Sequence, residues 1–283
     1  MNETIANTKR GIQWELTTTL EDLDFADDIV LLSSSHKDMQ EKINSLILKA
    51  NTIGMKINIG KTKLLKQNAR NEQPITINGI PVEEVKEFTY LGSTVTEDGD
   101  SSRDIDLRIT KATQAFGALF KIWKSKKLSM KTKVRIFKSN VLSVLLYGSE
   151  CWKMTNKTIQ KLDSFQTKCL KKIKRVFWLN IIRNEDLLKE TQMEMISTVI
   201  EERRWRWIGH VMRMPHDSLP RIAAQWTPQG KRGRGRPIKT WRSTATKMLS
   251  TRGLTWGTAR RKAEDRICGG LFSFMVVLCV MGT

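Results

Sequence analysis

The stretch LEDLDFADDIVLLSSS, residues 20–35, decides how the first part of the chain folds. It places two adjacent carboxylates, Asp27 and Asp28, between a Phe-Ala pair and the apolar run 29–32, which is typical of a buried strand. The pattern predicts a strand, an acid-bearing turn and a second strand. Because an unpaired carboxylate in a low-dielectric site is costly, the stretch predicts a metal ion, a buried partner or an exposed hairpin tip at these acids.

A helix is predicted directly after this hairpin. The serine cluster at residues 33–35, with Asp38 three residues further on, forms a capping-box start. Apolar residues then recur at helical spacing over residues 37–53, and Gly54 ends the pattern. We therefore expect one helix to pack on a small antiparallel sheet.

The remaining strands of the first hundred residues are indicated by alternation and turn signals. Residues 55–59 alternate as a strand, Asn78-Gly79 is a hairpin signal, and EFTYLGSTV at 87–95 is an aromatic-rich strand segment. Together these elements predict a compact α+β unit to which Asp27 and Asp28 belong.

Beyond Glu97 the hydrophobic period becomes helical. Three apolar stripes predict core-facing helices: Ile105, Ile109, Ala112, Phe116, Leu119, Phe120 and Trp123; Val134, Phe137, Val141, Val144 and Leu145; Ile159, Leu162, Phe165, Cys169 and Ile173. Cations are expected on the outer faces of these helices: Lys121, Lys124, Lys126, Lys127, Lys131, Lys133, Arg135, Lys171, Lys172, Lys174 and Arg175. Such a surface suits a phosphate backbone.

The charge of the chain is unevenly distributed. The 283 residues carry a net charge of +20, and their 40% apolar content is enough to build a core, which excludes a disordered chain. Residues 1–100 hold 11 basic and 16 acidic side chains, whereas residues 101–283 hold 38 and 13. A positive field of this size predicts a polyanionic partner, most simply nucleic acid; the alternative is a merely solvated basic surface.

The segment RRWRWIGHVMRMP, residues 203–215, interleaves tryptophan with arginine. Aromatic faces beside guanidinium groups can stack on bases while they neutralise phosphates. The candidate nucleic-acid-binding residues are Arg203, Arg204, Trp205, Arg206 and Trp207. The alternative is an amphipathic helix whose tryptophans belong to the core.

The segment QGKRGRGRPIKTWR, residues 229–242, has basic residues separated by glycine and followed by Pro237, so it predicts a loose linker over 226–238. Its Arg-Gly-Arg-Pro core resembles the AT-hook, in which arginines enter a narrow minor groove; a plain basic linker is the alternative. The candidate contact residues are Lys231, Arg232, Arg234 and Arg236.

The cysteines and the two ends of the sequence indicate the cellular compartment of the protein. The four cysteines are scattered without metal-ligand spacing, which favours reduced thiols in an intracellular protein. No secretory leader precedes residue 20, so we expect a nuclear or cytoplasmic protein that is not secreted. The apolar tail at 267–283 is too short to span a bilayer, so no membrane partner is expected, and its structure is uncertain.

Adjacent acids on a tight turn suit two-metal nucleotidyl transfer, because carboxylates are good ligands for Mg²⁺. The order of the motifs resembles the reverse transcriptases of non-LTR (LINE-type, RTE-like) retrotransposons from about Lys9 to Asp265. FADD, residues 25–28, is similar to the catalytic palm box, and ANTIGMKINIGKTK, residues 50–63, is similar to the next palm motif. The resemblance implies that Asp27 and Asp28 bind Mg²⁺ and that Lys61 protonates the leaving pyrophosphate.

The later motifs extend the resemblance. EFTYLGS, residues 87–93, looks like the primer grip, which implies contacts from Phe88, Tyr90, Leu91 and Gly92. The implied organisation is a partial palm over 1–98, a helical thumb or connection over 99–180 and a basic nucleic-acid-binding region over 181–266. The implied fold class is α+β, a truncated polymerase palm followed by a mostly α-helical thumb and basic C-terminal region.

The family has another metal-binding aspartate on an earlier palm strand, after the fingers. Residues 1–26 offer Glu3 and Glu15 but no such strand. We therefore expect a fragment of an RNA-directed DNA polymerase that is inactive alone and works with an upstream polymerase or endonuclease region, an RNA template and a DNA primer. The alternatives are a non-catalytic protein that binds duplex DNA or RNA through its basic half, and a helical interaction protein.

Overall fold

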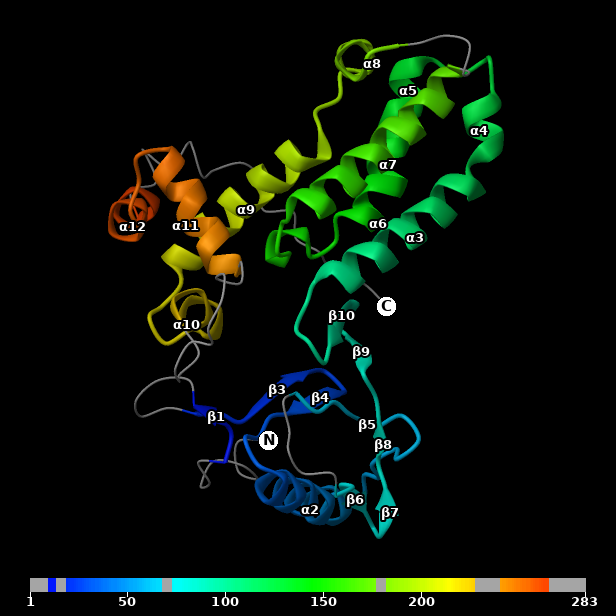
Figure 1. Cartoon of the computed structure of the whole chain (residues 1–283). Helices are drawn as coiled ribbons and strands as arrows, with labels where there is room; N and C mark the ends of the chain where they lie inside the picture. The colour runs from blue at the N-terminus through cyan, green and yellow to red at the C-terminus, as the bar shows by residue number, and fades with distance from the viewer. Residues whose placement is uncertain (1–9, 14–18, 68–72, 177–181, 227–239, 265–283) are drawn as a thin grey trace. The chain divides into compact units, whose positions relative to one another are not determined.

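A computed structural model of the chain describes residues 10–13, 19–67, 73–176, 182–226 and 240–264. It divides into two compact units, Met1–Asp100 with Trp226–Pro228, and Ser101–Gln225 with Gln229–Thr283 (Figure 1). Short strand pairs and one helix make up the regular structure in the described part of the first unit, and helices make up that of the second. The predicted α+β class is confirmed.

The strands of the first unit pair two by two and do not join into a larger sheet within the described residues. Four ladders are antiparallel: β1 (Ile12–Gln13) with β2 (Thr19–Leu20), β3 (Asp22–Phe25) with β4 (Asp28–Leu31), β6 (Thr76–Ile77) with β7 (Ile80–Pro81), and β9 (Glu87–Tyr90) with β10 (Ser93–Thr96). The ladder of β5 (Lys63–Leu64) with β8 (Glu83–Glu84) is parallel. The Asn78-Gly79 turn between β6 and β7 is confirmed, and both residues have positive φ, as a type I′ turn requires.

The helix α2 (His36–Thr52) begins at the predicted cap. The Ser35 side chain accepts a hydrogen bond from the backbone N–H of Asp38 at 3.1 Å. The inner face of α2 packs with the strand segments around a small core of Ile43, Ile75, Ile77 and Val82. The predicted helix is therefore confirmed, with its boundaries shifted by one residue.

The strand predicted over residues 55–59 is wrong. The chain leaves α2 in an irregular segment and then turns, because the Lys61 and Thr62 amides donate to the Asn58 carbonyl at 3.2 and 3.0 Å. The Asn58 side chain also accepts from the Lys61 amide at 3.1 Å. An asparagine that bonds its own downstream backbone in this way competes with a strand ladder.

The second unit is built from helices and helical turns. In chain order they are α3 (Ser102–Ala118), α4 (Phe120–Lys124), α5 (Met130–Ile136), the π-helix η1 (Phe137–Leu142), α6 (Ser143–Leu145), the 3₁₀ turn η2 (Ser149–Cys151), α7 (Asn156–Lys174), α8 (Asn184–Thr191), α9 (Ile196–Arg213), α10 (Leu219–Gln225), α11 (Trp241–Thr251) and α12 (Trp256–Glu264). No helix in the described ranges is long and apolar enough to cross a membrane.

The larger core of this unit confirms the predicted apolar stripes of α3, α5 to α6, and α7. Ile105, Phe137 and Leu162 are fully buried in it. Phe120 is the exception, since its side chain is 55% exposed beneath the ammonium of Lys124, 4.4 Å from the ring centroid. The short helix α4 turns Trp123 inward instead, where the indole stacks on Phe116 at 5.0 Å.

A second core joins the end of α9 to α11 and α12. It contains Trp205, Ile208 and Met212 of α9, together with residues of the two later helices. Ile196 and Ile200, at the start of α9, belong to the larger core. One continuous helix therefore contributes to both cores, as Figure 1 shows for α9 with α7 on one side and α11 and α12 on the other.

Candidate functional site

The predicted acid hairpin is present, and its acids lie at an exposed tip. Asp28 is the first residue of β4 and pairs with Phe25, while Ala26 and Asp27 form the two-residue turn. Asp27 and Asp28 are both exposed. Of the three arrangements that the sequence allowed, the structure shows the exposed tip; the apolar run is less buried than expected, since Ile29 is 43% exposed.

The turn that carries the acids has an unusual backbone. Ala26 has a φ of 55°, in the left-handed region where a Cβ is sterically disfavoured. A positive φ at the first central position of a two-residue hairpin turn normally goes with glycine, asparagine or aspartate, and alanine is unusual there. Leu91, in the turn between β9 and β10, has a φ of 47° and is followed by Gly92 at 78°. Non-glycine residues with positive φ thus lie in both hairpins that the resemblance assigns to the polymerase site, and such strain often accompanies function.

The structure brings these two hairpins together although they are far apart in sequence. The Tyr90 hydroxyl, on β9, donates a hydrogen bond to the Leu23 carbonyl, on β3, at 3.3 Å. Burial raises the pKa of Tyr90, and the negative charges of Asp28 and Asp24 raise it further. The Tyr90 side chain therefore lies against the acid hairpin and braces it.

The other residues that the sequence assigned to the polymerase site are placed separately. Phe88 is half-buried on β9 and pairs with Val95, while Leu91 and Gly92 are exposed at the turn. Lys61 is exposed in the turn that follows α2, and its side chain has no hydrogen bond or ion pair within the described residues. The role of Lys61 as a proton donor remains a prediction.

A buried ion pair that the sequence analysis missed lies at the base of the acid hairpin. The Lys42 ammonium, on α2, pairs with Glu21 and donates to the carbonyls of Leu32 at 2.6 Å and Glu21 at 3.1 Å. The Glu21 carboxylate also accepts from the Gly11 amide at 2.9 Å and the Thr19 hydroxyl at 2.5 Å. These contacts fix the ends of both strands to α2. The sequence signal that could have revealed this pair is a lysine, Lys42, within the apolar stripe of the helix.

The pKa of Glu21 reflects this environment. Burial raises it, but the hydrogen bonds from Lys42, Thr19 and the Gly11 amide, together with the charge of Lys42, outweigh burial and leave the pKa below its ordinary value. Within the described residues no three His, Cys, Asp or Glu side chains lie close enough to hold a metal ion as a group. Asp27 and Asp28 carry carboxylate oxygens, a ligand type that Mg²⁺ prefers in proteins, and their role as metal ligands remains a prediction.

The predicted Trp/Arg cluster of residues 203–207 lies on α9, and part of the prediction is corrected. Arg204 and Trp205 are buried, with 2% and 3% of their surface exposed. A helix advances 100° per residue, so these two positions share the inner face with Ile208 and Met212. Arg204 donates to the Trp152 carbonyl at 2.5 Å, and Arg252 covers the Trp205 ring at 4.4 Å. Neither residue is available to nucleic acid in this conformation.

The remaining members of that cluster keep some surface. Arg203 is half-buried and donates to the Leu146 carbonyl at 2.8 Å. Arg206 is exposed beside Glu202 at 3.3 Å, and Trp207 is half-buried next to His210. The candidate interface on α9 is therefore reduced to Arg206 and Trp207. Lys231, Arg232, Arg234 and Arg236 lie outside the described residues, as does the tail at 267–283.

A group of exposed cations, here called the basic end, lies where α4, α5 and the end of α7 meet. The Arg175 guanidinium, which follows α7, donates to the Lys124 carbonyl at the end of α4. The exposed members of the basic end are Lys121, Lys124, Lys126, Lys127, Lys131, Arg135, Lys172 and Arg175. Lys171 and Lys174 are half-buried, and Lys174 pairs with Glu190.

Lys133 does not belong to this surface, contrary to the prediction. Its ammonium is buried and donates to the Trp123 carbonyl at 3.0 Å, which closes the C-terminal end of α4. Burial lowers the pKa of Lys133, and the charge of Arg175 lowers it further.

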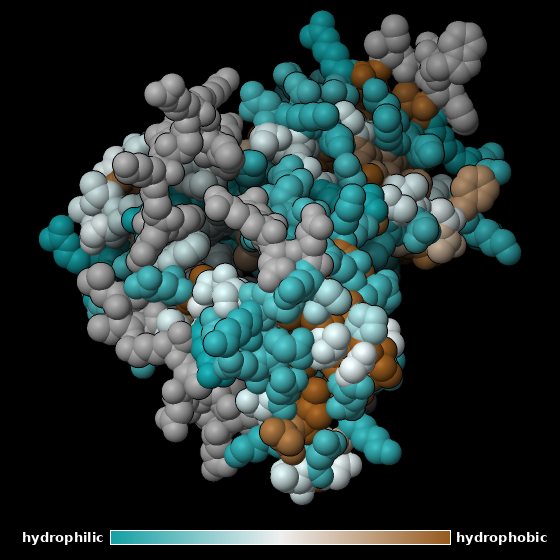
Figure 2. Space-filling model, turned by 60° about the horizontal axis from the view of Figure 1, so that its bottom comes forward, coloured by the Kyte–Doolittle hydropathy of each residue, from teal (hydrophilic) through white to brown (hydrophobic). Residues whose placement is uncertain are grey.

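Figure 2 shows that hydrophilic residues cover much of the described surface in that view, with smaller hydrophobic groups between them.

Comparison with known proteins gives two similarities. Residues 115–147, which include α4 and α5, match a family model described as a domain of unknown function, DUF6451. Over 244 residues the chain is 28% identical to an uncharacterised transposon-derived protein of Caenorhabditis elegans, a match that covers 82% of this chain and 86% of the relative. The chain is a relative of a transposon-derived protein. That similarity extends across both units and agrees with an origin in a mobile element.

Proposed function

We propose that the chain is a palm-and-thumb portion of a non-LTR retrotransposon reverse transcriptase. The observation that carries the proposal is the exposed hairpin tip with Asp27 and Asp28, braced by Tyr90 of the β9–β10 hairpin. The similarity to a transposon-derived protein supports the origin, and the motif order supports the class of enzyme.

In this proposal Asp27 and Asp28 are metal ligands in the intact polymerase. Two adjacent carboxylates on a tight turn present hard oxygen donors to the same volume of solvent, which fits Mg²⁺. Magnesium, when bound there, would activate a primer hydroxyl and stabilise the leaving pyrophosphate. The buried Glu21–Lys42 pair holds the base of the hairpin in place, and the strained Ala26 fixes the direction of its tip.

The β9–β10 hairpin would position the primer in the same proposal. Its turn residues Leu91 and Gly92 are exposed, while Tyr90 is fixed against β3. A primer held at this turn would lie next to the acid tip, because the two hairpins are in contact. Lys61 would donate a proton to the leaving group, as the resemblance implies.

The test is primer extension on an RNA template with magnesium. We expect the chain alone to incorporate no deoxynucleotide, because the family's further metal-binding aspartate is not among the matched residues. Joined to the upstream polymerase region of an element of this type, it should extend the primer, and Asp27→Ala should abolish extension.

Asp24→Asn is the matched control, since Asp24 is exposed on the same hairpin but pairs with Ile29 on the opposite face from Asp28. Extension by the joined protein that survives Asp27→Ala would contradict the proposal. So would extension by the chain alone that vanishes in Asp27→Ala.

A second candidate function is nucleic-acid binding without catalysis. The observation that favours it is the basic end, whose eight exposed cations lie on α4, on α5, in the segment that joins these two helices and at the end of α7. Such a surface neutralises phosphates whether or not the acid hairpin holds metal. Its salt dependence separates this function from that of a helical interaction protein.

A further inference from the structure

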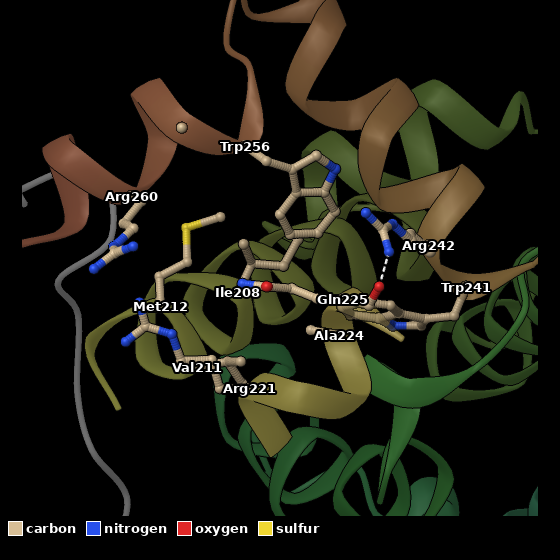
Figure 3. A pocket seen from close by; sticks show the side chains of 11 residues that line it. Ile208, Val211, Met212, Arg221, Ala224, Gln225, Trp241, Arg242, Trp256 and Arg260 are labelled. Atoms are coloured by element: carbon tan, nitrogen blue, oxygen red, sulfur yellow. Dashed lines mark hydrogen bonds between the residues drawn. The ribbon is translucent and has the colours of Figure 1, made fainter. Parts of the chain in front are cut away.

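A pocket of about 280 Å³ lies in the second unit, between α9, α10, α11 and α12 (Figure 3). Its floor is the apolar face of α9, formed by Ile208, Val211 and Met212. Aromatic and cationic side chains line the rest: Arg221, Trp241, Arg242, Trp256 and Arg260. Neither the polymerase site at the acid hairpin nor the basic end includes this pocket.

Two tryptophans supply the planar surfaces of the pocket. Trp241 and Trp256 are the first residues of α11 and α12. The Trp241 indole donates to the Glu150 carbonyl at 2.8 Å, and the Trp256 indole donates to the Thr246 hydroxyl at 2.9 Å. These hydrogen bonds hold each indole ring by its N–H edge. Figure 3 shows the Trp256 ring extending between Arg260 on one side and Arg242 on the other.

Three arginines give the pocket a positive charge. In the described part of the chain, none of the residues that line it is acidic. The guanidinium of Arg260 lies 2.8 Å from His216 Nε2, and that of Arg221 lies 3.4 Å from the same atom. Two guanidinium groups therefore converge on one ring nitrogen. Each guanidinium has five N–H donors in a fixed fork, a geometry that matches phosphate.

Arg242 lies at the other side of the pocket. It donates to the Gln225 carbonyl at the end of α10, the contact drawn as a dashed line in Figure 3. That contact fixes the direction of the side chain, and the remaining donors of the guanidinium face no carboxylate among the lining residues that the structure describes. The pocket thus combines aromatic faces with guanidinium groups on both sides.

We propose that this pocket binds a nucleotide, with the base stacked on Trp256 and the phosphate held by Arg260 and Arg221 or by Arg242. Base stacking on aromatic side chains and charge-assisted phosphate contacts are the interactions that these residue types make best. A volume of about 280 Å³ is at the small end of ligand sites, which favours one nucleotide over a longer segment. The ligand is a free mononucleotide or one unstacked nucleotide of a strand.

This inference goes beyond the polymerase proposal, since the pocket lies in the second unit and does not involve Asp27 or Asp28. It also differs from charge-driven binding at the basic end, because it requires an aromatic face. Variants of the pocket should therefore affect binding without changing primer extension chemistry at the acid hairpin.

The test uses two charge variants and two aromatic variants of the full chain. Arg260→Gln should weaken nucleotide binding about tenfold, because a charge-assisted hydrogen bond is lost. Arg261→Gln is the matched control, since Arg261 is the next residue of α12, is exposed and does not line the pocket. Trp256→Leu should weaken binding about tenfold, whereas Trp256→Phe should stay within about threefold of the wild type because it keeps a stacking face.

The probes are adenosine monophosphate and a short oligothymidylate that carries one iododeoxyuridine, measured by calorimetry and by photocrosslinking. Losses with both probes in Arg260→Gln and Trp256→Leu support a site for free nucleotides. Losses with the oligonucleotide alone, with a crosslink to Trp241 or Trp256, support a site for one nucleotide of a strand. Equal losses in Arg260→Gln and Arg261→Gln, or crosslinks only outside the pocket, would overturn the proposal. Thermal unfolding of each variant shows whether it remains folded.

Discussion

The buried ammonium of Lys42 holds the acid hairpin in place at the scale of single residues. It lies 97% buried between the two strand ends and pairs with Glu21, which also accepts hydrogen bonds from the Arg10 and Gly11 amides and the Thr19 hydroxyl. Removal of one partner from a buried pair leaves an uncompensated charge, which costs more than the pair itself contributes.

Lys42→Met should therefore lower the free energy of unfolding of the first unit by about 3 kcal/mol. Urea denaturation followed by circular dichroism measures this change. The control is the double variant Glu21→Leu with Lys42→Met, which removes both charges and should recover most of the loss. A double variant as unstable as Lys42→Met would show that the loss comes from packing.

The lowered pKa of Glu21 predicts how stability depends on pH. A carboxyl whose pKa is lower in the folded state stabilises the fold fully above its unfolded value, here 4.5. This contribution is lost as the pH falls through the lower pKa of the folded state. Urea denaturation between neutral and acidic pH should show a loss below about pH 4.5 in the wild type that is smaller in Glu21→Gln. Parallel curves for the two proteins would contradict the assignment.

At the scale of elements, the turn of the acid hairpin stores strain in Ala26. Ala26 has a φ of 55°, which glycine adopts without a Cβ clash. Ala26→Gly should raise the free energy of unfolding by about 0.5 to 1 kcal/mol. Thermal denaturation measures the gain, and Ala26→Val, with a branched Cβ, should change stability in the opposite direction. If the strain serves to orient Asp27, Ala26→Gly should also reduce the extension activity of the joined polymerase.

The two faces of α9 give neighbouring arginines different roles. Arg204→Ala should lower the free energy of unfolding of the second unit by about 3 kcal/mol, because the Trp152 carbonyl loses its donor and a cavity forms. Arg206→Ala should change it by less than about 0.5 kcal/mol, because Arg206 is exposed. Guanidinium denaturation measures both. Equal destabilisation by the two substitutions would contradict the assigned orientation of α9.

Local signals explain which elements the sequence predicts correctly. The Ser35 cap, the Asn78-Gly79 turn and the apolar stripe of α7 are short-range patterns, and the structure confirms each. The strand at 55–59 is wrong because the Asn58 side chain closes a turn that alternation does not reveal.

The site is less predictable than the elements. The acid tip follows from adjacent residues, but the Tyr90 contact, the Glu21–Lys42 pair and the pocket join residues that are distant in sequence. Alternation of Arg and Trp at 203–207 indicates a mixed surface, yet the helical period places Arg204 and Trp205 inside. Such long-range contacts depend on packing, which a local pattern does not specify.

At the scale of the whole molecule, opposite charges separate into the two units. The first hundred residues are net acidic, and the remainder carries the positive charge. Binding of nucleic acid through the basic end should therefore weaken steeply with salt, because neutralised phosphates release counterions. A logarithmic slope near zero would exclude this mode of binding.

Replacement of Lys124, Lys127 and Lys131 by glutamine should reduce that slope by about two to three. The matched control replaces Lys157, Lys247 and Lys262, which are exposed outside the basic end and change the net charge equally. Fluorescence anisotropy at several salt concentrations measures both. If the two triple variants lose the same slope, binding depends on net charge and not on the basic end.

The membership of α9 in two cores has a consequence during synthesis on the ribosome. The first half of α9 can pack as soon as it leaves the exit tunnel, because α7 precedes it. The second half must wait until α12 has been made, which takes several seconds at about 5–20 residues per second. In that interval Trp205, Ile208 and Met212 face water or a chaperone. A stalled nascent chain that exposes residues up to Arg213 should be cleaved within α9 by protease, whereas one that exposes residues up to Glu264 should be protected there.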